Sequence, residues 1–387
     1  MLIRGRSMIE ATTGQPVTSH ERILALDVFR GFAMFGVLIA YTMWSLGTAP
    51  DVSWSALDNR LGELVNFFVD GKFYTILATL FGFGFSIQLG RAADDAAAVD
   101  IYCRRLAVLA AIGLAHALLL RNGDILLPYA LTGYLMIPFR NARDRTILIA
   151  ALVAFLIPAV AGMASKSLGI AIPDRPQIQN APYLVENAAW ARYWYRTAIF
   201  TWPTNLTLFL FGLLLGRHRV LDKIRDRPRT LITIVLCGLG VGTALFFVDR
   251  ALVHARWASI GSVTGLIFTI HCWGMSSAYI AALLLALRTN AGERILMPLS
   301  AIGRMALTNY LSQAAIIVPL CLAFGWFDQF TPTRSLALAL ILFIFVQLPF
   351  SLMWLRHFEF GPAEWVWRML TYGRIPSLRR SIAVGPA

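Results

Sequence analysis

The stretch GLAHALLLRNGDILLPYALTGYL, residues 113–135, decides the fold class because a short polar break separates two apolar runs. An apolar run of about 20 residues can cross a hydrocarbon core of about 30 Å as a helix. The break at 121–124 contains Asn-Gly, a dipeptide typical of tight turns. The stretch therefore predicts two antiparallel membrane helices that meet at a turn.

The composition extends this prediction to the whole chain. Of 387 residues, 58% are hydrophobic and only 14% are charged, whereas a soluble protein has about 25% charged residues. The net charge of +13 comes from basic residues at the ends of the apolar runs, where they face anionic lipid headgroups, so we expect no nucleic-acid partner. The four cysteines form no metal-binding pattern, and no metal is expected.

The predicted fold is an all-α, polytopic membrane helix bundle of about ten transmembrane helices. Of the 34 Lys and Arg residues, 23 lie in the N-terminal segment, the tail and alternate connections, which predicts that both termini are cytoplasmic. We divide the chain into a cytoplasmic segment 1–22, a transmembrane domain 23–355 and a cytoplasmic amphipathic tail 356–387. The predicted spans are 23–47, 66–90, 102–120, 125–140, 146–165, 198–216, 230–249, 259–287, 299–325 and 335–355.

The longest predicted external loop, 166–197, carries an aromatic cluster that includes Trp190 and Trp194. Two interpretations stay open for this cluster. It either forms a lid whose rings stack on a sugar, or belongs to the aromatic belt at the membrane interface.

Ionisable residues inside membrane spans are costly and therefore mark functional candidates. His116 lies just over one helical turn below the turn at 121–124, and the Asn-Gly turn can fold Asp124 back toward it. An imidazole changes charge near neutral pH, and a neighbouring carboxylate can orient it and support its charged form. We therefore predict His116 as a general base assisted by Asp124, with His271 as the second candidate.

Further polar residues interrupt other spans. Asp27 and Arg30 share one helix face and predict either a structural ion pair or an arginine ready for an anion. Asp70-Gly71-Lys72 predicts a break between an external lead-in helix and a span, with Lys72 facing either the protein interior or water. Gly82 and Gly84 predict close helix packing.

The stretch GRMALTNYLSQ, 303–313, places Arg304, Thr308 and Asn309 at helical spacing. Interhelical hydrogen bonding explains the amides, and a guanidinium at the cytoplasmic edge is suited to phosphate. The chain has no P-loop, HExxH or GxSxG motif, which excludes the common nucleotide-binding and hydrolase classes.

Five segments together resemble the YeiB family of bacterial multi-span membrane proteins: LDVFRGFAMFGVL at 26–38, KFYTILATLFGFGF at 72–85, GLAHALLLRNGDILLPYALTG at 113–133, GRMALTNYLSQ at 303–313 and GPAEWVWRMLTYG at 361–373. This family in turn resembles the transmembrane acyltransferases that include heparan-α-glucosaminide N-acetyltransferase. The shared entry motif is Asp27-x-x-Arg30-Gly31. The chain departs from those relatives at Tyr41, where Asn is common, and in its first external loop, which lacks a His.

The resemblance implies an inner-membrane enzyme that transfers an acyl group from cytoplasmic acyl-CoA to a hydroxyl or amine of an envelope glycan or small molecule. A proton-coupled transporter of a small molecule is the main alternative, and a non-catalytic envelope scaffold is a third option. The oligomeric state stays open between a monomer and a homodimer. We expect His116, Asp124 and Lys72 to take part in catalysis, with Lys72 as an oxyanion donor. The residues expected to hold the CoA phosphates are Arg30, Arg104, Arg105 and Arg304. The residues expected to bind the acceptor are Asp70, Tyr129, Trp190, Trp194 and Asn309, while Asp27, Gly82 and Gly84 are expected to be structural.

Overall fold

The computed structural model describes residues 24–46, 54–89, 96–121, 123–169, 176, 182–254, 263–327 and 329–380. The predicted N-terminal segment 1–22 lies outside these ranges. The described part is a bundle of helices with one isolated β-bridge between Phe358 and Arg379. The helices of the first half are α1 (Leu24–Ser45), α2 (Ala56–Phe68), α3 (Lys72–Leu89), α4 (Ala96–Leu119), α5 (Leu126–Met136), α6 (Asp144–Ser167), α7 (Tyr183–Arg196) and α8 (Pro203–Arg217). Those of the second half are α9 (Val220–Arg225), α10 (Pro228–His254), α11 (Val263–Ala286), α12 (Asn290–Arg304), α13 (Ala306–Phe324), α14 (Pro332–Ile341), α15 (Leu348–His357) and α16 (Pro362–Tyr372).

Seven helical stretches within the described ranges are long and apolar enough to cross a membrane. They comprise α1, α2 with α3, α6, α10, α11, α13, and α14 with α15. The chain is therefore an all-helical, multi-pass membrane protein. The ten predicted spans and the orientation of the termini stay predictions.

Three predicted spans differ from the observed helices. The predicted span 125–140 contains α5, which has 11 residues, and the span 198–216 contains α8, which has 15. Both are shorter than the roughly 20 residues that cross a bilayer. The span 299–325 is divided at Met305 into α12 and α13. The predicted loop 166–197 contains a helix, α7.

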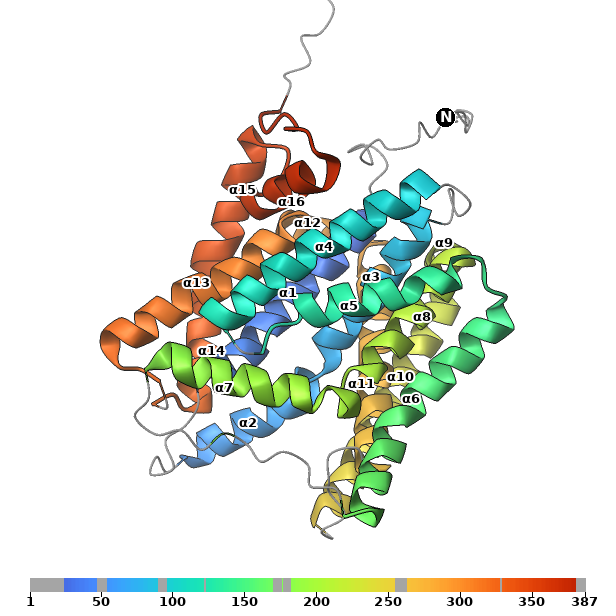
Figure 1. The fold of residues 1–387 in the computed structure, drawn as a ribbon, viewed down its shortest axis with the longest axis vertical. Helices are drawn as coiled ribbons and strands as arrows, with labels where there is room; N and C mark the ends of the chain where they lie inside the picture. The colour runs from blue at the N-terminus through green and yellow to red at the C-terminus, as the bar shows by residue number, and fades with distance from the viewer. Residues whose placement is uncertain are drawn as a thin grey trace, which may run out of the picture.

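The helix α1 lies in the middle of the bundle, behind α4 in Figure 1. Its side chains Phe29 and Leu38 are fully buried, and α3, α12 and α14 pack around it. A side-chain carbon at Gly303 of α12 would lie 1.8 Å from the carbonyl oxygen of Asp27, and one at Gly31 would lie 1.9 Å from that of Leu299. The two glycines therefore allow the backbones of α1 and α12 to touch, as small residues do in membrane helix pairs.

The break at Asp70-Gly71 has the predicted position. Gly71 adopts a positive φ of 77°, which separates α2 from α3 at little steric cost. The short helices α5 and α8 lie among longer ones, because α5 packs on α4 and α8 packs on α3 and α6. The helices α2 and α7 lie near one end of the bundle, and α16 lies near the opposite end (Figure 1).

The predicted amphipathic tail contains α16, which packs on α4 and α13. Glu364 Oε1 accepts hydrogen bonds from the backbone N–H groups of Leu307 (2.7 Å) and Thr308 (3.1 Å), and the Thr308 hydroxyl donates to Oε2 (2.5 Å). These N–H groups belong to the first turn of α13, where a helix has no partners of its own. Burial raises the pKa of the Glu364 carboxyl, although these hydrogen bonds oppose the shift.

Replacing Glu364 with Ala is expected to destabilise the protein by about 1–3 kcal/mol, because buried donors at the start of α13 lose their acceptor. Glu364→Gln retains an acceptor oxygen and is the matched control. The pKa of Glu364 in the folded protein lies above its ordinary value. The protonated carboxyl therefore adds to the free energy of unfolding at low pH, and this contribution is lost as pH rises through the folded-state pKa. Thermal unfolding in detergent should show that the wild type loses stability relative to the Glu364→Gln variant as pH rises from 4 to 8. Equal unfolding temperatures for Ala and Gln would refute the capping role.

Candidate functional site

The hairpin of α4 and α5 brings His116 and Asp124 together. A side-chain carbon at Gly113 would lie 2.8 Å from Oδ2 of Asp124 and 2.5 Å from the backbone nitrogen of Leu127. Gly113 therefore leaves the space into which Asp124 folds back over α4. The returning carboxylate is fixed there, because the Leu127 N–H donates to its Oδ2 at 2.8 Å.

The His116–Asp124 pair is buried on the inside of this hairpin. Nδ1 of His116 lies 3.0 Å from Oδ1 of Asp124, and the two side chains are 2% and 0% exposed. The contact is close, but it lacks the direction of a well-formed hydrogen bond. The carboxylate thus lies directly beside the ring nitrogen Nδ1 of the imidazole.

Tyr310 of α13 is the third member of the site. Its hydroxyl donates to Oδ1 of Asp124 at 3.1 Å and accepts from the backbone N–H of Ile125 at 3.2 Å. The Tyr310 and His116 rings have centroids 5.0 Å apart. Tyr310 belongs to the segment 303–313 that the sequence singles out, but Asn309 was chosen there in its place. A hydroxyl within a span was the signal that could have found it.

The second ring nitrogen of His116, Nε2, is buried and has no hydrogen-bond partner among the described residues. A buried polar atom without a partner is costly and is uncommon outside functional sites. With Asp124 beside Nδ1, this nitrogen is the one that a substrate proton could reach. The pair therefore has the composition of a general base with a supporting carboxylate.

A layer of aromatic and polar side chains covers the pair at the turn. The Arg121 guanidinium lies 4.1 Å from the centroid of the Tyr41 ring, a cation–π contact. Tyr41 therefore holds the Arg121 side chain at the end of α4. No pattern in the sequence indicated this contact, because 80 residues separate its members.

The helix α7 lies across the C-terminal end of α4. The buried Asn187 amide donates to the carbonyl oxygens of Ala117 (2.7 Å) and Leu118 (2.9 Å), directly after His116 in the chain. The Tyr183 hydroxyl donates to the carbonyl of Leu120. Burial raises the pKa of Tyr195 to about 12, and the nearby charge of Asp124 adds to this shift. Thus α7 covers the site, although the sequence predicted a loop there.

The aromatic residues Trp190 and Trp194 lie on α7 but contact neither His116 nor Asp124 in any described interaction. Their ring centroids are 6.5 Å apart, and Trp194 is 41% exposed. This placement is compatible with both interpretations of the aromatic cluster.

The four arginines predicted to hold phosphates have different surroundings. Arg30 lies 3.0 Å from Asp27, and it is close enough to Arg105 for their charges to repel. Arg105 stacks on Trp367 of α16 at 4.2 Å and donates to Gln88 at 3.2 Å. The other two are placed differently: Arg304 donates to the carbonyl of Glu359 at 3.3 Å, and the exposed Arg104 pairs with Asp100 at 2.8 Å. Arg30 is near enough to Arg105 for their charges to act on each other, whereas Arg104 turns outward.

Lys72 belongs to a different cluster from His116. Its fully buried ammonium donates to the carbonyl of Asn66 at 2.6 Å and lies 5.3 Å from the centroid of Phe268. The ring of Phe268 also packs against His271, whose Nδ1 lies 2.7 Å from the carbonyl oxygen of Gly242. The part-buried Asp70 is nearby, and its charge acts on Lys72. This placement does not support Lys72 as an oxyanion donor beside His116.

Two residues predicted to bind the acceptor are used in helix packing. The buried Tyr129 hydroxyl donates to the carbonyl of Tyr74 at 3.1 Å. The buried Asn309 amide donates to the Ser351 hydroxyl and the Met305 carbonyl, both at 3.0 Å. The polar groups of both residues are therefore engaged between helices, which favours the packing interpretation of Asn309.

Gly82 and Gly84 differ although both lie on α3. A side-chain carbon at Gly82 would lie 2.0 Å from the carbonyl oxygen of Phe209 on α8, whereas nothing lies within 4 Å of one at Gly84. Gly82 therefore has the predicted packing role, and Gly84 has open space beside it.

The fold and the buried pair define the chain as a multi-pass helical membrane protein with a His–Asp pair in its interior. Residues 215–374 match the family described as "Protein of unknown function (DUF418)". The chain is 32% identical over 381 residues to the "Uncharacterized 39.9 kDa protein in amylase 3'region" of Bacillus acidopullulyticus, covering 93% of this chain and 96% of that protein. It is also 27% identical to YxaH of Bacillus subtilis (strain 168) and to YeiB of Escherichia coli (strain K12). These matches cover 92% and 91% of this chain, respectively, and 96% of each relative.

The chain therefore belongs to the YeiB-like, DUF418-containing family. The resemblance to this family is confirmed over nearly the whole length. None of the three relatives has a name that states an activity, so membership of the acyltransferase superfamily remains a proposal.

Proposed function

We propose that the protein is an integral membrane acyltransferase that uses acyl-CoA as the acyl donor. The observation that carries this proposal is the buried His116–Asp124 pair, in which Nε2 of His116 has no partner among the described residues. A base in this position suits the activation of a hydroxyl or amine in a water-poor site.

In the proposed reaction, Nε2 of His116 takes the proton of the acceptor hydroxyl or amine as its oxygen or nitrogen attacks the thioester carbonyl. The new C–O or C–N bond forms, the C–S bond breaks, and the imidazolium returns the proton to the departing CoA sulfur. Asp124 stabilises the transient positive charge of the imidazole. The Tyr310 hydroxyl, which donates to Asp124, holds that carboxylate in place.

The donor is proposed to bind along α4. Arg105 and His116 lie on this helix eleven residues apart, which corresponds to about 16 Å along the axis. Arg105 with Arg30 would bind the phosphates at one end, and the extended arm of CoA would carry the thioester toward His116. Guanidinium groups are suited to this task because they contact phosphate oxygens in pairs.

Donor binding along this route requires the helices to separate. Leu109 of α4, Ala130 of α5 and Leu307 of α13 are buried against one another, and Trp367 of α16 packs against this cluster. Since Trp367 also covers Arg105, we place the required opening at α16. The acceptor, an envelope glycan or a small molecule, is proposed to enter from the side of α7.

Arg105→Gln is expected to weaken CoA binding roughly tenfold or more, because hydrogen bonds to charged groups contribute about 1.5–3 kcal/mol each. Arg104→Gln is the matched control, since Arg104 is the preceding residue but is exposed and pairs with Asp100. Titration of CoA into detergent-purified protein at two salt concentrations measures the effect, and added salt should weaken wild-type binding. Equal affinities for both variants would remove Arg105 from the donor site.

The proposed orientation places both termini in the cytoplasm at the inner membrane. In a background without Cys237, Leu168→Cys should react with an impermeant maleimide in intact cells, whereas Lys223→Cys should react only after permeabilisation. The opposite pattern would reverse the orientation.

A proton-coupled transporter is the second candidate function. The observation that favours it is the presence of two buried ionisable clusters, one around His116 and one around Lys72 and His271. Such residues also form proton relays in transporters. Saturable binding of acyl-CoA favours the enzyme, whereas pH-gradient-driven uptake without CoA binding favours the transporter.

A further inference from the structure

A pocket of about 320 Å³ lies at the end of the bundle where α1 and α12 begin and α9 and α11 end. None of the residues predicted for catalysis or donor binding lines it. Its volume falls within the range of small-molecule sites. The pocket is therefore separate from the His116 site and independent of the proposed acyl transfer.

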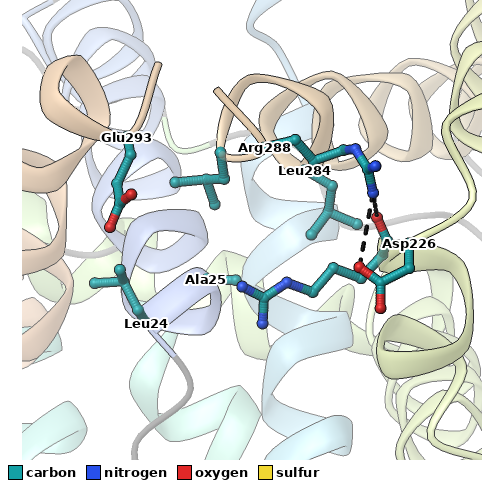
Figure 2. A pocket seen from close by; sticks show the side chains of 8 residues that line it. Leu24, Ala25, Asp226, Leu284, Arg288 and Glu293 are labelled. Carbon is teal, nitrogen blue, oxygen red and sulfur yellow. Dashed lines mark hydrogen bonds and ion pairs between the residues drawn. The ribbon is translucent and has the colours of Figure 1, made fainter. Parts of the chain in front are cut away.

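The walls of the pocket carry opposite charges. Figure 2 shows Glu293 on one wall, and Arg288 with Asp226 on the opposite wall. Arg288 donates to the carbonyl of Arg225 at 2.6 Å, and its guanidinium lies 3.7 Å from the Asp226 carboxylate, which is 89% exposed. Such a long, solvent-exposed ion pair contributes little to stability, and another anion can easily replace Asp226 beside Arg288.

Arg225 and Glu293 are two exposed, oppositely charged residues of the lining, and no hydrogen bond or ion pair between their side chains and another described residue is found. A ligand that contacts both through opposite charges carries a negative and a positive group at once. The pocket thus favours a zwitterion over a simple anion.

The pocket also lies at the boundary of the membrane-spanning layer. One candidate span begins at Leu24 and another ends at Ala286, and both ends adjoin the pocket. Leu24, Leu284 and Leu287 supply apolar lining beside the charges. Because the ends of membrane-spanning helices lie at the level of the lipid headgroups, a ligand held here would lie at that level too.

We propose that this pocket binds the headgroup of an aminophospholipid, with its phosphate on Arg225 and Arg288 and its primary ammonium on Glu293. The leucines contact the glycerol end and the first carbons of the acyl chains. A primary ammonium donates three hydrogen bonds, whereas a trimethylammonium donates none, so the site distinguishes ethanolamine from choline headgroups.

The test uses the full-length protein, purified in a maltoside detergent and stripped of lipid. Thermal unfolding is measured with dihexanoyl phosphatidylethanolamine, with the choline and glycerol analogues, and with inorganic phosphate. A ligand that binds only the folded protein raises its unfolding temperature. The ethanolamine lipid is expected to stabilise the protein most, at roughly tenfold lower concentration than the choline analogue.

Two variants localise the effect. Glu293→Gln should remove the preference for ethanolamine, and Arg225→Gln should weaken binding of all three lipids. Glu63→Gln and Arg229→Gln, which lie outside the pocket, are the matched controls and should behave as wild type. All four positions are exposed, so each variant is expected to fold. The proposal is overturned if the glycerol lipid or inorganic phosphate stabilises as well as the ethanolamine lipid, if no lipid stabilises, or if Glu293→Gln keeps the preference.

Discussion

His116→Ala is expected to slow acyl transfer about 10²–10⁴-fold, the usual contribution of a general base. Without the imidazole, no described group beside Asp124 can accept the proton of the acceptor. Acyl-CoA binding should persist, because the arginines proposed to hold the phosphates lie elsewhere on α4 and α1. Rate measurements at saturating acyl-CoA, combined with CoA titration, separate the two effects.

Three further variants show whether His116 acts as a base or only fills space. Asp124→Asn should lower the rate less than His116→Ala, because the imidazole remains but its charged form loses support. Tyr310→Phe keeps the ring beside His116 and removes only the hydroxyl, so its effect should be smaller again. Full acyl-transfer activity in His116→Ala would show that His116 is not the general base, and His271 would then be the next candidate. His116→Gln is included because it keeps a polar side chain, and loss of folding in both His116 variants would make the residue structural.

Gly82→Ala is expected to cause the largest loss of stability among single-carbon changes on α3. The added carbon would lie 2.0 Å from a backbone oxygen of α8, which cannot move away as a flexible side chain can. Overpacking of this kind costs about 1–3 kcal/mol, and occasionally more. The unfolding temperature in detergent and the fraction of monodisperse protein on size exclusion report the loss.

Gly84→Ala is the matched control, two residues further along the same helix. Among the described residues, no atom of another helix lies within 4 Å of its added carbon, and Ala favours a helix over Gly by about 1 kcal/mol. It should therefore be neutral or slightly stabilising. Equal behaviour of the two variants would contradict the close crossing of α3 and α8.

The sequence predicted the helical class and the hairpin of α4 and α5 because both depend on local signals. The apolar runs indicated membrane helices, and the Arg-Asn-Gly-Asp turn indicated that Asp124 returns toward His116. The break between α2 and α3 was predicted for the same reason, since Gly71 lies where the chain must change direction.

Features set by distant contacts could not be predicted in this way. No Gly or Pro at Met305 marks the division between α12 and α13. The start of α13 is capped by Glu364, which lies more than fifty residues further along the chain. Nothing in the sequence of α7 indicates that the Asn187 side chain donates a hydrogen bond to the C-terminal end of α4. The sequence left open whether Lys72 faces the protein interior or water, because its neighbours on α11 lie two hundred residues away in the chain.

Consumption of acyl-CoA by membranes that contain the protein tests the central claim most directly. Acyl-CoAs from acetyl to palmitoyl, labelled in the acyl group, are incubated with membranes containing wild-type or His116→Ala protein at equal levels. Free CoA thiol and label in the envelope fraction are then measured. We predict that wild-type membranes release thiol and transfer label from at least one acyl-CoA, and that His116→Ala membranes do neither, although both purified proteins bind that acyl-CoA equally. Absence of binding and of thiol release for every acyl-CoA with the wild-type protein would contradict the proposed acyltransferase.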